Sequence, residues 1–297
     1  MLTFQIAELA LCLDAGGTDL EMTAPPTYVN FLWQPPVSNG ATASQPEPCP
    51  SINKLLLKIH NVPAINTHRW HKLLHKDVLW ELWRDEAGRF IFVNLLEPGY
   101  YWSAVDADFS HGEVIINHPL LTQSKNYPLQ SMDLRIYVNW LGNYGDALLH
   151  ASCVVLNGEG YCFVGQSGAG KSTLAKFLKS EHGFVVLGED HVVLRYISHQ
   201  FWVFGTPWHV NAEMCSPIGV PLKKVFFLDR DLRPGVSLIQ PIKGITWLLQ
   251  TAFIPYYRPE IVDKILGNFS ILGESTPFYS LSYPLGTNAW ELIDSVN

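Results

Sequence analysis

Short apolar runs separated by turn residues fill the chain between Lys54 and Pro119. They are KLLLKIHNV, VLWELWRDEAGRFIFVNLL and YYWSAVDADFSHGEVIIN. Runs of this length that are rich in β-branched and aromatic residues are typical of strands, and the polar residues inside them are typical of hairpin turns. The pattern therefore predicts strands and hairpins, with one turn at Asp85–Gly88 and another near His111–Gly112.

The pattern changes after residue 130. The segment SMDLRIYVNWL over 131–141 places its apolar residues on one helical face, and the stretch GNYG over 142–145 supplies a stop signal. ALLHASCVVLNGEGYCFVG then predicts two strands joined at 157–160. STLAKFLKSEHG predicts an amphipathic helix that ends at Gly183, and FVVLGEDHVVLRYI predicts strand material interrupted at 188–190.

These patterns predict a mixed α/β chain in two parts. We expect a β-rich N-terminal region over residues 1–145 and a second domain over residues 146–297. Residues 35–52, PPVSNGATASQPEPCPSI, are rich in proline, serine and glycine and have no apolar period, which predicts a surface loop or linker. The aromatic residues of 54–119 either form the core of the first region or supply part of a docking surface, and the core is the preferred interpretation.

Composition narrows the classes of partner. Only 16% of the 297 residues are charged and the net charge is -7, so we expect no broad positive surface for nucleic acid. The five cysteines include no C-x-x-C pair, which fits a reducing cytoplasm. The first residues lack a basic leader and carry Glu8 within an apolar stretch, and no run approaches 18 apolar residues. We therefore expect a cytoplasmic protein without a membrane partner.

A phosphate-binding motif stands between the predicted strand YCFV and the amphipathic helix. The segment GQSGAGKS, Gly165–Ser172, matches G-x-x-x-x-G-K-[ST] in full. Its glycines let the backbone point N–H groups inward at the positive end of the helix, Lys171 can reach the β- and γ-phosphates, and the Ser172 hydroxyl can coordinate Mg²⁺. The sequence therefore predicts ATP and Mg²⁺ as cofactors. The residues expected to bind them are Gly165, Gln166, Ser167, Gly168, Ala169, Gly170, Lys171, Ser172 and Thr173.

The residues around this motif resemble a known family. The segments are LLHASCVV at 148–155, the P-loop, GEDHVVL at 188–194, TPWHV at 206–210, PLKKVFFL at 221–228 and PFYSLSYPLGTNAWELID at 277–294. Together they are similar to the kinase domain of HPr kinase/phosphorylase and its relatives, which include peptide-modifying kinases found beside lasso-peptide systems. The resemblance covers about residues 146–297. It implies an HPr-kinase-like P-loop core, of the fold that also serves phosphoenolpyruvate carboxykinases, in the second domain.

The resemblance also implies catalytic residues. His150 occupies the place of a family histidine that precedes the strand leading into the P-loop. Without the resemblance, a histidine in this apolar segment would somewhat more often be a core residue than a catalytic one. Glu189 and Asp190 stand where the family has two adjacent aspartates. One carboxylate would hold the metal, to which we assign Ser172 and Asp190, and the other would accept the proton of the attacking hydroxyl. Glutamate replaces the first aspartate, so Asp190 is the stronger candidate for the base. Pro207-Trp208-His209 belongs either to an acceptor-side loop or to the core.

The function predicted from these observations is an ATP-dependent kinase. It would use Lys171, His150, Glu189 and Asp190 to transfer the γ-phosphate to a hydroxyl, with a serine of a peptide or small protein as the expected acceptor. A small-molecule kinase of the same fold and a nucleotide-binding regulatory protein without turnover are the alternatives. A processive ATPase would need an oligomeric arginine finger and an apolar strand ending in an acid, and the core does not plainly supply either of them. The glycine-rich signature of the phosphorylase is not recognisable. A homo-oligomer is compatible with the family resemblance.

Overall fold

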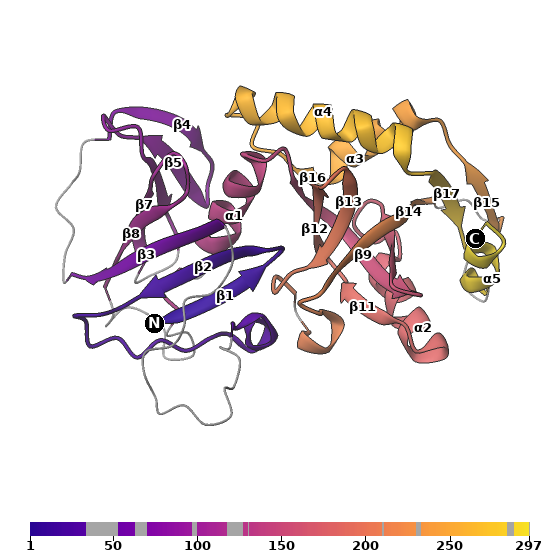
Figure 1. Cartoon of the computed structure of the whole chain (residues 1–297), viewed down its shortest axis with the longest axis horizontal. Helices are drawn as coiled ribbons and strands as arrows, with labels where there is room; N and C mark the ends of the chain where they lie inside the picture. The colour runs from indigo at the N-terminus through magenta and orange to yellow at the C-terminus, as the bar shows by residue number, and fades with distance from the viewer. Residues whose placement is uncertain are drawn as a thin grey trace. The chain divides into compact units, whose positions relative to one another are not determined.

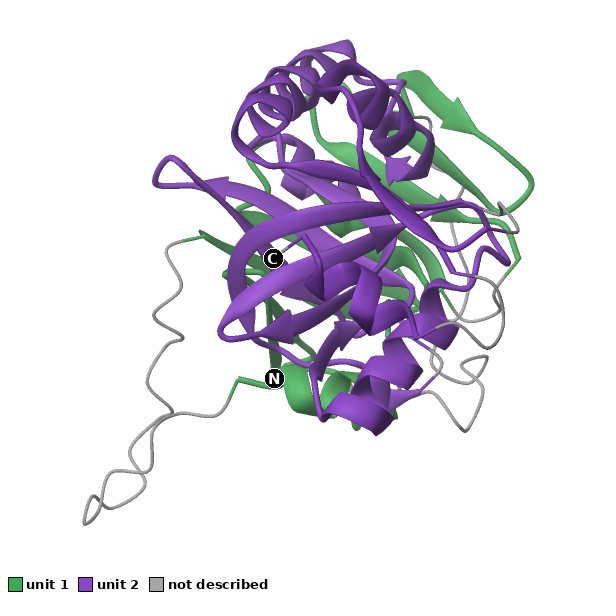
Figure 2. Cartoon of the chain, turned by 90° about the vertical axis from the view of Figure 1, so that its right-hand side faces the viewer, with its two compact units in different colours: residues 1–137 green, residues 138–297 purple. Residues whose placement is uncertain are grey.

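The computed structural model describes residues 1–33, 53–62, 70–96, 100–117, 127–129, 131–209, 211–229, 233–283 and 288–296. The chain divides into two compact units, residues 1–137 and 138–297, which Figure 2 colours separately. The division falls inside helix α1, Met132–Gly142. The linker predicted over residues 35–52 lies outside the described residues. Within the described ranges, no helix has both the length and the apolar character needed to cross a membrane.

Unit 1 is built on one sheet of eight strands. Its strand order is β1-β2-β3-β8-β7-β6-β5-β4 (Figure 1). Strands β2, β3 and β8 pair in parallel, whereas β4 to β8 form antiparallel neighbours. The elements are β1 Leu2–Ile6, β2 Leu9–Asp14, the 3-10 helix η1 Pro26–Phe31, β3 Asn53–Asn61, β4 Lys72–Lys76, β5 Trp80–Arg84, β6 Phe90–Asn94, β7 Tyr100–Val105 and β8 His111–Ile116.

One of the two hairpin turns predicted in unit 1 is confirmed at its predicted position, and the other lies a few residues earlier than predicted. The turn at Asp85–Gly88 joins β5 to β6, and Gly88 adopts the positive φ of 85° that this turn requires. The second turn does not lie at His111–Gly112, because His111 already opens β8. It covers 106–110 instead, where the Asp108 carboxylate accepts hydrogen bonds from the N–H and hydroxyl of Ser110. The positive φ of 57° in this turn belongs to Phe109, so Gly112 does not mark its position.

The predicted core role of the aromatic residues in unit 1 is confirmed for three of them. Trp80, Tyr100 and Trp102 are buried. Trp83 and Tyr101 are partly buried and pack against the cluster around Trp102. Because each ring covers apolar neighbours, these residues stabilise the sheet.

Unit 2 consists of a mixed sheet with helices on both faces. The strand path runs β10-β9-β12-β13-β14-β17-β15, and β14 also pairs in parallel with β10. The remaining short strands β11 and β16 each pair with β9. The elements are β9 Ala147–Leu156, β10 Glu159–Val164, α2 Lys171–His182, β11 Val185–Gly188, β12 His191–Ile197, β13 Gln200–Gly205, the 3-10 helix η3 Ala212–Met214, β14 Gly219–Asp229, β15 Gly235–Leu238, α3 Pro241–Thr251, β16 Ala252–Phe253, α4 Pro259–Ser275, β17 Phe278–Ser282 and α5 Ala289–Asp294.

The alternation of side chains along β10 shows how the layers of unit 2 are packed. Cys162 and Val164 lie in a core cluster that contains residues of α3 and α4. Tyr161 and Phe163 lie in a second cluster that contains residues of α2 and α5. Since successive strand residues face opposite sides of a sheet, β10 separates two helical layers and is buried on both faces. Burial on both faces explains its nearly continuous apolar sequence.

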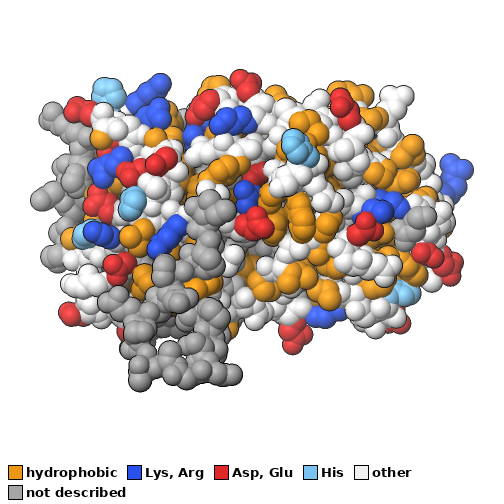
Figure 3. All heavy atoms as spheres, viewed as in Figure 1, with side chains coloured by type: hydrophobic (Ala, Val, Ile, Leu, Met, Phe, Trp, Pro, Cys, Tyr) orange, Lys and Arg blue, Asp and Glu red, His pale blue; other side chains and the backbone are white. Residues whose placement is uncertain are grey.

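The coarse predictions for the second half of the chain are confirmed. The helix expected over 131–141 is α1, and the two strands joined at 157–160 are β9 and β10, whose turn is Asn157–Gly158. The strand material after the P-loop helix divides into β11 and β12 at 189–190. The chain is therefore a mixed α/β protein with two large sheets. On the face seen in Figure 3, acidic and basic side chains are interspersed.

A buried ion pair near the start of β9 provides the first testable prediction. Arg195 Nε lies 2.7 Å from Asp146 Oδ2, Tyr196 N donates to Asp146 Oδ1 over 3.0 Å, and both charged side chains are almost fully buried. Removing one member leaves the other charge in an apolar environment. We expect Asp146→Ala to lower the free energy of unfolding by about 3–5 kcal/mol in a urea titration followed by circular dichroism.

The control for this prediction is Glu181→Ala, which removes an exposed carboxylate of α2. Exposed substitutions of this kind change stability by about 0.5 kcal/mol or less. Equal, small losses for both variants would show that the ion pair contributes little to unit 2.

Candidate active site

The P-loop occupies the turn between β10 and α2. Strand β10 ends at Val164 and α2 begins at Lys171. Gly168 and Gly170 have φ values of 75° and 98°, which side chains other than glycine rarely adopt. Gly170 is the N-cap of α2. Because it has no side chain that could accept hydrogen bonds from the first turn, the N–H groups of that turn face the loop. These features fit a polyphosphate, which would accept hydrogen bonds from these donors.

Lys171 lies under the loop and is only 5% exposed. Its Nζ donates to the carbonyl oxygens of Gly165 and Gln166 over 2.8 and 3.2 Å and lies 3.0 Å from His150 Nε2. Burial lowers the pKa of the Lys171 ammonium, and the negative charge of Asp190 opposes that shift. The ammonium is thus held at the base of the loop between β10 and α2, beside His150.

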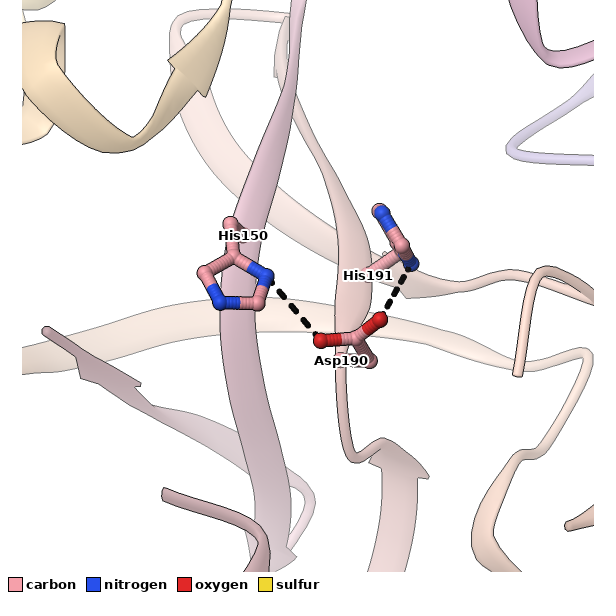
Figure 4. A group of neighbouring side chains, drawn as sticks. All are labelled: His150, Asp190 and His191. Carbon is pink, nitrogen blue, oxygen red and sulfur yellow. Dashed lines mark ion pairs between the residues drawn. The ribbon is translucent and has the colours of Figure 1, made fainter. Parts of the chain in front are cut away.

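Figure 4 shows that His150, Asp190 and His191 form one ionic cluster. Asp190 Oδ1 lies 3.0 Å from His150 Nδ1, and Asp190 Oδ2 lies 3.1 Å from His191 Nδ1. Since Lys171 donates to His150 Nε2, the proton of the His150 ring lies on Nδ1 and is donated to Asp190. Hydrogen bonds from the two histidines hold the pKa of Asp190 well below its ordinary value of 3.8. Asp190 is therefore ionised at neutral pH.

Backbone pairing between β9 and β12 brings these side chains together. His150 and His191 are directly opposite in the antiparallel register, and Ala151 N donates to Asp190 O over 3.0 Å. Two of the predicted catalytic residues, His150 and Asp190, are thus placed beside Lys171. The separation of His150 and Asp190 in the sequence does not reveal how β9 and β12 pair.

Glu189 has a different environment from Asp190. Its backbone oxygen accepts hydrogen bonds from the hydroxyls of Ser152 and Ser172, over 2.6 and 3.2 Å. Its carboxylate is buried, and Oε2 lies 3.6 Å from Lys176 Nζ on α2. The Glu189 backbone therefore joins the P-loop helix to β9, while its carboxylate faces α2. Ser172, the predicted Mg²⁺ ligand, is linked to the acidic pair through that backbone oxygen.

The structure adds residues that the sequence analysis did not assign to the site. His191 directly follows the acidic pair and was available as a signal in GEDH. Its Nδ1 also lies 2.8 Å from the carbonyl oxygen of Trp208, and its backbone oxygen accepts from Thr206. His209 lies next to it, with ring centroids 6.2 Å apart. The segment Pro207-Trp208-His209 therefore lies beside the cluster.

Strand β14 corrects one statement of the sequence analysis. An apolar strand ending in an acid was not evident, yet β14 ends KVFFLD at Asp229 and runs parallel to β10. A cavity of about 300 Å³ contains Asp229 together with Gly165, Gln166 and Trp247 in its lining. The acid was missed because only the parallel pairing of β10 and β14 places it beside the P-loop.

Gly170 permits a second prediction. A Cβ at this residue would lie 2.6 Å from the hydroxyl oxygen of Tyr283, which donates to Gly170 O over 2.7 Å. We expect Gly170→Ala to weaken ATP binding at least about tenfold, because the left-handed φ and the clash distort the loop at a cost of roughly 1–2 kcal/mol or more. Calorimetric titration with Mg-ATP measures this effect.

Gly183→Ala is the matched control for Gly170→Ala. Gly183 also has a positive φ, 70°, but it lies at the other end of α2 and a Cβ there meets nothing within 4 Å. It introduces similar backbone strain and should keep the affinity for ATP. Equal affinities of the two variants would argue against a phosphate-binding role for Gly170.

The comparisons with known proteins leave the family open. No family model matches the chain, and no curated protein matches it. Among solved structures, the chain is similar to the "Structure of the Hpr(Ser) kinase/phosphatase from Coxiella burnetii", with 14% identity and a TM-score of 0.29 over 50% of this chain and 87% of that chain. A likeness at this level carries no weight for the fold or the activity. Membership of the HPr-kinase-like group and a link to lasso peptides stay predictions.

Proposed function

We propose that the chain is an Mg²⁺-dependent ATP kinase that transfers the γ-phosphate to a hydroxyl group. The observation that carries this proposal is the contact between Lys171 of the P-loop and the His150–Asp190 pair, with Nζ 3.0 Å from His150 Nε2 and Nδ1 3.0 Å from Asp190 Oδ1. The ammonium of Lys171 thus contacts one nitrogen of the His150 ring, and the ionised carboxylate of Asp190 contacts the other. Phosphoryl transfer requires both groups near the γ-phosphate.

The residues of the P-loop would bind and neutralise the nucleotide. The backbone donors of Gly165–Thr173 would bind the phosphates, and Lys171 would compensate the charge that builds up on the equatorial oxygens. Mg²⁺ would be held by Ser172 and Asp190, with charge neutralisation as its contribution when bound. Asp229 lines the cavity beside the loop and is suited to hold a water of that ion.

We propose that Asp190 is the residue that contacts the acceptor hydroxyl. Each of its oxygens receives one histidine N–H and keeps a second lone pair, so the carboxylate can orient the hydroxyl and take its proton as the new P–O bond forms. The Glu189 carboxylate faces Lys176 instead. His150 and His191 would fix the orientation of Asp190. The proton then leaves to solvent after ADP departs.

The acceptor class rests on the family resemblance. HPr-kinase-like enzymes modify serine hydroxyls of proteins and peptides, so we propose a serine of a peptide or small protein as acceptor. A small-molecule hydroxyl is the alternative within the same chemistry. A nucleotide-binding regulatory protein is the alternative outside it.

The test is transfer of label from γ-labelled ATP with Mg²⁺ to a panel of serine peptides, metabolites with hydroxyl groups, and proteins of a cell extract. Transfer of label to a serine by the wild-type chain, but not by Lys171→Ala, supports the proposal. Label on a metabolite alone would show that the acceptor is a small molecule and not a serine of a peptide or protein. Release to water alone would favour an ATPase, for which the position of Asp229 beside the P-loop provides a structural basis.

A further inference from the structure

The sheet of unit 1 carries large apolar side chains on both faces. One cross-strand row is at most 2% exposed and consists of Ile59, Val114, Ser103, Phe92 and Leu82. Because successive strand residues face opposite sides of a sheet, the adjacent row lies on the second face, and it consists of His60, Ile115, Trp102, Val93 and Glu81. A sheet with one solvated face ordinarily carries polar residues there. The three central residues of this second row are apolar, and apolar surface of this kind marks interaction sites.

Aromatic rings and a cavity lie together on this second face. Trp102 is buried there, and the rings of Trp70, Trp83 and Tyr101 are partly buried against its cluster. The centroids of the Trp70 and Trp83 rings are 5.7 Å apart. A cavity of about 650 Å³ has Trp70 and Trp102 in its lining. Since ligand pockets usually have volumes of about 300–1,000 Å³, this cavity is large enough to receive a ligand.

The rim of the cavity is acidic. Its charged and titratable side chains are the carboxylates of Asp85, Glu86 and Glu113, the guanidinium of Arg89, and His60, which is charged only when protonated. Arg89 donates to Asp85 Oδ2 over 2.8 Å and to Glu113 Oε1 over 2.9 Å, so its charge is shared between two carboxylates. Glu86 is exposed in the turn between β5 and β6 and makes no ion pair with another described residue. The surplus of negative charge favours a cationic partner.

The dimensions of the cavity favour a peptide as that partner. Its floor comes from four neighbouring strands, with His60 on β3, Ile115 on β8, Trp102 on β7 and Ile91 on β6. Neighbouring strands lie about 4.8 Å apart, so the floor is about 14 Å wide, which is the length of about four extended residues. We propose that this cavity binds a short peptide segment in which Lys or Arg stands next to a large apolar residue.

Each part of such a segment has a counterpart in the cavity. The apolar side chain would pack on Trp102 and Ile115. The cation would lie near Glu86 and the ring of Trp70, because the faces of indole rings attract cations. Binding of the segment does not depend on the proposed kinase activity. Its use to hold the acceptor peptide rests on that activity.

The experiment is a titration of fluorescently labelled hexapeptides with the full-length chain, followed by anisotropy at low and at physiological salt. The probes are four matched peptides that combine Lys with Leu, Glu with Leu, Lys with Ser, and Glu with Ser. We expect saturable binding of one Lys/Leu peptide per chain, at least about tenfold tighter than binding of the other three and weaker at the higher salt concentration. In NMR of the indole N–H groups, this peptide should shift the resonances of Trp70 and Trp102.

Two substitutions in the cavity test where the peptide binds. Glu86→Lys should weaken binding of the Lys/Leu peptide by roughly tenfold, and Trp70→Ala should weaken it by at least about tenfold. The matched control is Glu21→Lys, which reverses the charge of an exposed side chain of unit 1 outside the cavity lining and should keep the wild-type affinity. Lys171→Ala separates this inference from the proposed function, since this variant should lose Mg-ATP binding and keep peptide binding.

Three results would overturn the proposal: absence of saturable binding, equal affinity for the four peptides, or wild-type affinity in both cavity variants. A dimer of the chain in sedimentation that Trp70→Ala dissociates and the peptides do not affect would also overturn it, because a second copy would then occupy the cavity. If Trp70→Ala does not fold, Glu86→Lys and the indole shifts of the wild-type chain decide.

Discussion

Lys171→Ala is expected to lower phosphoryl transfer by about 10³-fold. The ammonium is buried at the base of the P-loop and is held by two loop carbonyl oxygens and His150 Nε2. Alanine removes the positive charge from the proposed position of the β- and γ-phosphates. Hydrogen bonds to charged groups contribute about 1.5–3 kcal/mol, so the affinity for ATP should also fall tenfold or more. The initial rate of label transfer from γ-labelled ATP measures the loss.

The control for Lys171→Ala is Lys179→Ala on the same helix. Lys179 Nζ donates to the backbone oxygen of Glu213 near the C-terminal end of α2. This variant removes the same charge from α2 and should keep the wild-type rate. A Lys171→Ala protein that folds normally in circular dichroism and still transfers phosphate at a rate near wild type would remove the P-loop from the mechanism.

Asp190→Asn is expected to reduce transfer by about 10²–10⁴-fold, with a smaller loss of Mg-ATP affinity because Ser172 and the backbone donors of the P-loop remain. The amide keeps one acceptor oxygen, but its NH₂ group faces the N–H of one of the two histidines, which breaks one of the hydrogen bonds now made over 3.0 and 3.1 Å. The variant also loses the negative charge that we propose orients the acceptor hydroxyl. Single-turnover transfer and calorimetric titration separate the rate from the affinity.

The pH dependence of stability gives a second readout for Asp190→Asn. The pKa of Asp190 is lowered in the folded chain, chiefly by the hydrogen bonds from His150 and His191, so its carboxylate stabilises the fold above its ordinary pKa of 3.8 and loses this contribution as the pH falls further. The stability difference between wild type and variant should therefore be largest at neutral pH and shrink below about pH 4. Glu189→Gln should affect transfer less, because its carboxylate faces Lys176. Equal losses in both variants would contradict the assignment of Asp190.

The local elements around the site could be predicted from the sequence because short-range physics determines them. The run YCFV, the glycine-rich loop and the apolar period of STLAKFLKSEHG fall on β10, the P-loop and α2. Positive φ at Gly168 and Gly170 explains why glycines stand at these two positions. The mixed α/β character of the chain could be predicted because the apolar residues change from short strand-like runs to a helical spacing near residue 130.

The contacts of the site could not be predicted, because they depend on strand pairing between distant segments. The pair His150 and His191 requires β9 to lie beside β12 in one register, and a shift by one residue would turn the side chains to opposite faces. Asp229 reaches the P-loop only because β14 runs parallel to β10. Nothing in the local pattern of either segment encodes these neighbours. The turn at 106–110 was placed a few residues too late for a different reason, since Phe109 and not a glycine adopts the positive φ there.

Equilibrium binding of Mg-ATP to the full-length chain, measured by titration calorimetry, tests the central claim most directly. The account predicts saturable binding of one nucleotide per chain that requires Mg²⁺ and weakens at least about tenfold in Lys171→Ala and in Gly170→Ala, while Lys179→Ala and Gly183→Ala bind as the wild type does. The absence of Mg-ATP binding by the folded wild-type chain, or equal binding by all four variants, would contradict it.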